Sequence, residues 1–145
     1  MTMTTKEAEA IKLDPDVYSR CVATAKGYYR MLQRQREIEE EIIHETHAPD
    51  GQPRGSGTGD PTARKVEKIL QRQRENDRKI KAVEQAWVSF EDERTRLFIK
   101  KNFFEGLLMR EICIMMPGGT PMAEITMKRY RKKFLIRLAE NLFEI

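Results

Sequence analysis

The chain has 145 residues, of which 34% are charged and 39% hydrophobic, and this composition excludes an intrinsically disordered protein. Its net charge of +4 is a small surplus, so the positions of the basic residues are more informative than their number. No run reaches the ~18 apolar residues of a membrane span, and the N-terminus has no apolar signal segment, so we expect a cytoplasmic protein that contacts no membrane.

The first predicted element is a helix within the N-terminal segment, residues 1–47. Asp14 suits the N-cap, because its carboxylate can accept hydrogen bonds from the first turn, and Pro15 suits the first helical position. Apolar residues then recur every three or four positions from Val17 to Leu32. The polar sequence QRQREIEEE follows, which predicts that the same helix continues with an exposed or partner-facing surface.

Residues 48–60 are rich in Gly and Pro and predict a flexible linker, because they have little apolar area to bury. A second long helix is expected over residues 61–88, with Asp60 as its N-cap and Pro61 in its first turn. Its apolar residues have a roughly heptad-like spacing. It can therefore pair with the first helix as an antiparallel hairpin, or form a coiled coil in a homodimer, and the sequence leaves both alternatives open.

The remaining residues, 89–145, predict three helices. Ser89 and Asp92 form a variant of the capping box that starts the first of these helices, and Gly106 suits a left-handed C-cap at its end. A short helix follows, and the breaker sequence PGGTP separates it from a last helix over about 123–143. No stretch alternates with period two, so we predict an all-α fold, with an N-terminal helical hairpin or coiled-coil arm and a C-terminal helix-turn-helix unit.

The last helix combines an apolar face with a cluster of basic residues. Its apolar positions are three or four residues apart: Met127, Tyr130, Phe134, Leu138 and Leu142. The opposite side is expected to carry Ile125, Lys128, Arg129, Lys132 and Ile136. In a helix-turn-helix protein such a helix enters the DNA major groove, where basic residues neutralise phosphates and arginine reads guanine. We therefore predict double-stranded DNA as the partner and the following DNA-binding residues: Glu124, Ile125, Thr126, Lys128, Arg129, Arg131, Lys132 and Lys133.

The sequence NFFEGLLMREIC, together with ITMKRYRKKFLIRLAENL, resembles the C-terminal region of phage transcriptional regulators of the RinA and ArpU type. The matching positions are Phe103, Phe104, Ile112, Cys113, Thr126, the basic run 129–133 and the ending 138–142. Those regulators are similar in turn to the DNA-reading region 4 of sigma factors. The resemblance implies a transcription regulator, and more specifically an activator, encoded by a prophage or mobile element. It also implies action in the cytoplasm of a bacterial host and adds host RNA polymerase to the candidate partners.

Catalytic and cofactor motifs are weak in this sequence, so we expect neither an enzyme nor a bound cofactor. The glycine-rich residues 55–60 lack the Gly-Lys-Ser/Thr of a phosphate loop. His44 and His47 have no paired cysteines nearby, so no metal site is predicted. Cys21 and Cys113 lie in helical apolar patterns and are predicted to be buried, reduced thiols.

Two other functions remain open at this stage. A small DNA-packaging (terminase) subunit would also bind DNA, but it would need to assemble as a ring. A helical adaptor would use the same basic face to bind an acidic protein rather than DNA.

Overall fold

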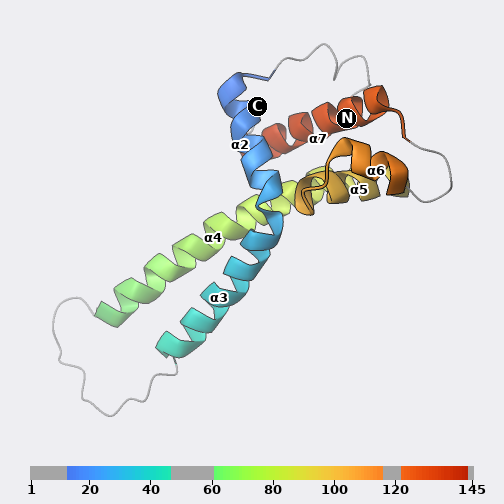
Figure 1. Cartoon of the computed structure of the whole chain (residues 1–145). Helices are drawn as coiled ribbons and strands as arrows, with labels where there is room; N and C mark the ends of the chain where they lie inside the picture. The colour runs from blue at the N-terminus through green and yellow to red at the C-terminus, as the bar shows by residue number, and fades with distance from the viewer. Residues whose placement is uncertain (1–12, 47–60, 116–121, 144–145) are drawn as a thin grey trace.

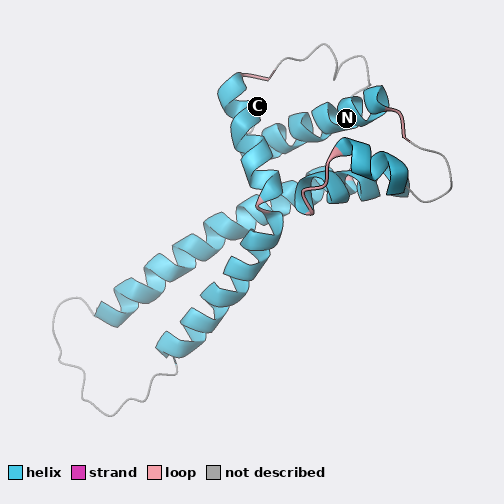
Figure 2. Cartoon of the chain, viewed as in Figure 1, coloured by secondary structure: helices cyan, strands magenta, loops and turns pink. Residues whose placement is uncertain are grey.

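The computed structural model describes residues 13–46, 61–115 and 122–143, which contain only helices and short connections, as the all-α prediction requires (Figures 1 and 2). The elements are α2 (Pro15–Lys26), α3 (Tyr28–Thr46), α4 (Pro61–Val88), α5 (Glu93–Ile99), the π-helix η1 (Lys100–Phe104), α6 (Met109–Met115) and α7 (Glu124–Phe143). The predicted linker and the PGGTP turn lie outside the described residues. None of the described helices is both long enough and apolar enough to span a membrane.

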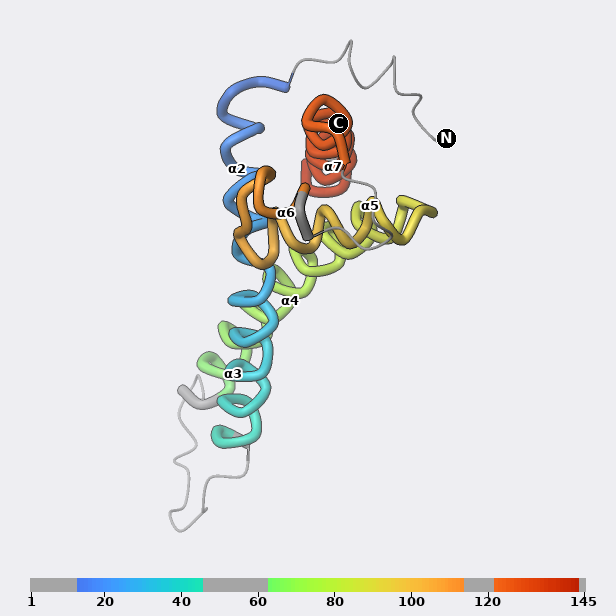
Figure 3. The backbone as a smooth tube through the Cα atoms, turned by 45° about the vertical axis from the view of Figure 1, so that its right-hand side comes forward, coloured from blue at the N-terminus to red at the C-terminus, as the bar shows by residue number. Residues whose placement is uncertain are grey.

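The molecule consists of an arm and a head. We define the arm as residues 28–46 with 61–80, and the head as the other described residues. The arm is the antiparallel pair of α3 and the first part of α4, and it extends away from the head (Figures 1 and 3). In the head, α7 packs against α4, α2, α5 and α6.

The prediction of one continuous first helix is wrong, because α2 ends at Gly27 and α3 leaves in another direction (Figure 1). Gly27 has ψ of 9°, and its N–H donates to the carbonyl oxygens of Ala23 and Ala25. Glycine is a poor helix former, which explains why the helix breaks here rather than among the good helix formers around it. As a result, α2 belongs to the head and α3 to the arm.

The arm is an intrachain hairpin of α3 and α4, which is one of the two arrangements that the sequence left open. Ile38 and Ile69 are each 3% exposed along the seam between α3 and α4. Asn76 is also buried there, and its amide donates to the oxygens of Met31 (backbone) and Gln35 (side chain), both at 2.9 Å. A buried amide with two partners is satisfied only in one register, so it favours this alignment of the two helices.

The start of α5 differs from the prediction by three residues. Its N-cap is Asp92, whose carboxylate accepts from the Arg94 N–H and the Thr95 hydroxyl. The Ser89 hydroxyl instead donates to the Ala86 carbonyl at the end of α4, so Ser89 does not start the helix. The prediction for Gly106 is confirmed, because this residue has φ of 73° at the turn that follows η1.

Aromatic and aliphatic side chains fill the core of the head, and the predicted apolar face of α7 supplies many of them. Met127, Phe134 and Leu138 are each at most 1% exposed. The rings of Phe103 and Phe134 lie 5.1 Å apart between centroids. Ile136 is an exception to the prediction, because it is 2% exposed and therefore does not belong to an outward side.

Candidate nucleic-acid interface

The two halves of α7, residues 124–133 and 134–143, have different surroundings. The second half is held against α4, where Asn141 donates to the Ala82 carbonyl (3.1 Å) and Arg78 donates to the Leu142 carbonyl (3.0 Å). The first half begins after Ala123, whose carbonyl accepts from Met127 at 3.0 Å, and its exposed residues outnumber its buried ones. The core therefore fixes the direction of α7 while the first half remains accessible.

The accessible side of the first half is called the outward face and consists of Ile125, Lys128, Arg129 and Lys132. At 100° per residue these positions cover about 100° of the helix circumference. Ile125 is 62% exposed, Lys128 and Arg129 are exposed, and Lys132 is half-buried. The face thus presents three cations and one apolar side chain on a single side of a fixed helix.

Lys128 already has an anionic neighbour on its own helix. Its ammonium lies 3.2 Å from the carboxylate of Glu124, and the two side chains are 63% and 69% exposed. An exposed pair of this kind contributes little to stability and is screened by salt. Lys128 can therefore exchange Glu124 for another anion at small cost.

Two further arginines of α7 are used in packing. The Arg131 guanidinium lies 4.6 Å from the centroid of the Phe103 ring and donates to the Asn102 side-chain oxygen. The Asn102 amide in turn donates to the Leu107 carbonyl at 2.9 Å, which ties α7 to the turn before α6. Arg137 lies 4.4 Å from the centroid of the Phe90 ring. Both arginines therefore stabilise the head, whatever else they bind.

The other predicted site residues lie beside the outward face. Glu124 is exposed, and Thr126 and Lys133 are half-buried. Burial lowers the pKa of Lys133, and the positive charge of Arg137 lowers it further. All eight predicted DNA-binding residues thus fall in the first half of α7, but only part of that set points outward.

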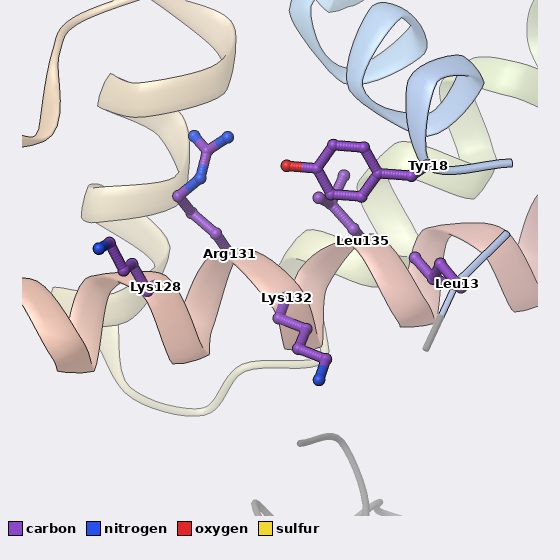
Figure 4. A pocket seen from close by; sticks show the side chains of 6 residues that line it. All are labelled: Leu13, Tyr18, Lys128, Arg131, Lys132 and Leu135. Carbon is purple, nitrogen blue, oxygen red and sulfur yellow. The ribbon is translucent and has the colours of Figure 1, made fainter. Parts of the chain in front are cut away.

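An open pocket of about 430 Å³ adjoins the outward face, between the start of α2 and α7 (Figure 4). It is lined by Leu13, Tyr18, Lys128, Arg131, Lys132 and Leu135. The Tyr18 hydroxyl points toward the Arg131 guanidinium, whereas the ammonium groups of Lys128 and Lys132 extend away from both (Figure 4). Among the lining residues that the structure describes, three are basic and none is acidic.

Sequence reasoning did not include Leu13 and Tyr18 in the site. The sequence predicted one continuous first helix. Residues near its start were therefore expected to belong to the arm and not to lie beside the last helix. Gly27 was the signal that separated α2 from the arm and placed it against α7.

Among the described residues, the cysteines and the histidine form no metal site. Cys21 is completely buried, which raises its pKa to about 11 and confirms the predicted buried thiol, whereas Cys113 is half-buried. Across the described ranges, no three His, Cys, Asp or Glu side chains lie close enough together to hold a metal ion. His44 is exposed on α3, and His47 lies outside those ranges.

Comparisons of the chain with protein-family models, with curated proteins and with solved structures found no match. The resemblance to phage regulators therefore stays a prediction, and the function has to be inferred from the geometry of the site.

Proposed function

We propose that the chain is a DNA-binding transcription regulator whose first half of α7 enters the major groove. The observation that carries this proposal is the outward face, on which three cations and Ile125 share one side of a helix end. An α-helix fits the major groove, and each phosphate neutralised by a basic side chain releases counterions. Both the shape and the charge of this face suit a DNA duplex.

The rigidity of α7 supports the same proposal. Phe134 and Leu138 are fully buried, so the second half of the helix is part of the core. Little conformational freedom has to be lost when the first half binds, because its backbone is already helical and fixed in direction. The short helix α6 precedes α7 in the chain, as a helix-turn-helix unit requires.

The outward face offers distinct roles to its members. Arg129 has a planar guanidinium that can donate two hydrogen bonds to a guanine edge, and Glu124 can accept from a cytosine amino group. Lys128 and Lys132 suit phosphates, because an ammonium acts mainly as a point charge. Ile125 is apolar and exposed at the N-terminal end of this face, where it can contact the methyl group of a thymine.

The arm suits a partner-binding or dimerising role beside a DNA-reading head. Its two helices already satisfy each other along the seam, so an additional partner would bind its charged outer surface. Host RNA polymerase and a second copy of the chain are the partners that we propose. A terminase subunit would instead form a ring, so a monomer or dimer in light scattering removes that alternative.

Binding to a pool of random-sequence duplexes tests the proposal. Fluorescence anisotropy should detect binding at about 50 mM salt and a steep loss of affinity by about 200 mM, because several phosphates are contacted. Repeated selection from the pool should then enrich a defined sequence. A helical adaptor would show no duplex binding even at the lower salt concentration, and that result would reject the proposal.

A further inference from the structure

The pocket between α2 and α7 contains hydrogen-bond donors that the reading of DNA bases by α7 does not require. Its basic side chains Lys128, Arg131 and Lys132 come from three positions within about one helical turn. Tyr18 reaches the same space from another helix and is 43% exposed, so its hydroxyl can donate to a ligand. Two helices thus contribute donors to one opening (Figure 4).

Described carboxylates at the start of α2 and of α7 have partners within their own segments. Glu124 lies 3.2 Å from Lys128. Asp16 lies 3.3 Å from Arg20, and Asp14 accepts from the Asp16 N–H at the start of α2. The lining itself therefore has a positive charge that these acids only partly offset.

The guanidinium of Arg131 has more donors than its bond to Asn102 uses. Arg131 uses an N–H group toward Asn102, but a guanidinium has five N–H donors. Leu13 and Leu135 cover the rest of the lining.

We propose that this pocket binds a phosphate group, with the Tyr18 hydroxyl and the Arg131 guanidinium as its donors and the charges of Lys128 and Lys132 beside them. A phosphate offers several acceptor oxygens and a negative charge, which match these donors. The group has two potential sources. It belongs to the DNA backbone if the proposed function is correct, because Lys128 and Lys132 are shared with the outward face. Otherwise it belongs to a small phosphorylated ligand.

The test uses the full chain and two probes, a selected DNA duplex and inorganic pyrophosphate. Tyr18→Phe removes only the hydroxyl, and Tyr29→Phe is its matched control, because Tyr29 is 44% exposed and lies outside the pocket. We expect Tyr18→Phe to weaken binding of one or both probes about tenfold, the loss typical of a hydrogen bond to a charged group. Tyr29→Phe should bind as the wild type does.

The two probes distinguish the two sources of the phosphate group, and they also separate the pocket proposal from the DNA proposal. Weaker duplex binding by Tyr18→Phe and by Lys132→Gln, with a smaller salt dependence for Lys132→Gln, identifies a backbone phosphate. Weaker pyrophosphate binding in a chain that binds no duplex identifies a small ligand, and rejects the DNA proposal while the pocket proposal stands. If Tyr18→Phe alters the binding of neither probe, the pocket proposal is overturned, while salt-dependent duplex binding leaves the DNA proposal standing. Circular dichroism checks that each variant is folded.

Discussion

The two halves of α7 contain similar residues in opposite surroundings. Ile125 is 62% exposed in the first half, whereas Ile136 is 2% exposed in the second. Arg129 is exposed in the first half, whereas Arg137 donates to the Ser89 hydroxyl and lies over the Phe90 ring. The neighbours of each half therefore decide whether an isoleucine or an arginine stabilises the fold or faces solvent. The basic residues of such a helix indicate a binding surface only in the part of the helix that does not pack against the core.

The two isoleucines provide the largest expected contrast. Ile136→Ala should lower the free energy of unfolding by about 2–5 kcal/mol, because it leaves a cavity in the buried half. Ile125→Ala should change it by less than about 0.5 kcal/mol, because the side chain is exposed. Urea denaturation measures both values. Similar losses for the two variants would contradict the difference between the halves.

The effects of the same two variants on duplex affinity should have the opposite order. Ile125→Ala should weaken binding to a selected duplex by about 1 kcal/mol if the side chain contacts a thymine methyl, which is the order expected for burial of one such group. Replacing that thymine by uracil should weaken wild-type binding similarly and leave Ile125→Ala unaffected. Ile136→Ala, measured at a temperature where it is folded, should bind like the wild type. If replacing the thymine by uracil left the wild-type affinity unchanged, Ile125 would not have this role.

Asn76 in the arm tests whether lost stability alone reduces DNA binding. Asn76→Ala should lower the free energy of unfolding by about 1–3 kcal/mol, because the Met31 carbonyl and the Gln35 amide oxygen lose their buried donor. Duplex affinity under folded conditions should not change, because the arm lies away from the outward face (Figure 1). A parallel loss of affinity would mean that the arm also contacts DNA.

High pH should lower the stability of the head, because the Cys21 thiol is buried there. Its pKa is raised to about 11 from an ordinary value of 9.0, so the unfolded chain loses the thiol proton first. The stabilisation is complete below about pH 9 and is lost as the pH rises toward 11, with a loss of about 1 kcal/mol by pH 10. Denaturation of Cys21→Ala should show a smaller decrease over this range than the wild type. An equal decrease in both would assign the effect to other groups.

The smallest effect on stability is expected for two lysines that form similar pairs. Lys128 lies 3.2 Å from Glu124, and Lys81 lies 2.9 Å from Asp77 on α4, each four residues apart. Lys128→Gln and Lys81→Gln should each cost less than about 1 kcal/mol of stability. Only Lys128→Gln should reduce the slope of log affinity against log salt, by about one. Equal slopes would show that Lys128 contacts no phosphate.

Local sequence signals predicted most elements but not the contacts between them. The spacing of Met127, Phe134 and Leu138 identified the buried face of α7, and Gly106 identified a turn. The same spacing placed Ile136 outside the core, because helical periodicity describes one face and cannot show that a second face is covered further along the helix. Tyr18 was missed because the break at Gly27 depends on tertiary packing as well as on propensity.

The helix that carries the candidate site was predictable from local signals, whereas the surroundings of its side chains were not. All eight predicted residues lie in the first half of α7, since charge and helix phase are local properties. The sequence gives no indication that Arg131 lies over Phe103 and bonds to Asn102, because those contacts join residues that are distant in the chain.

Charge reversal on the outward face tests the central claim most directly. The double variant Arg129→Glu and Lys132→Glu should lose at least about 100-fold in affinity for the selected duplex, because two attractive contacts become repulsive. Its helicity should match that of the wild type, and the same reversal at Lys79 and Lys81 in α4 should leave the affinity nearly unchanged. Undiminished duplex binding by the folded Arg129→Glu, Lys132→Glu variant would contradict the assignment of α7 as the DNA-reading helix.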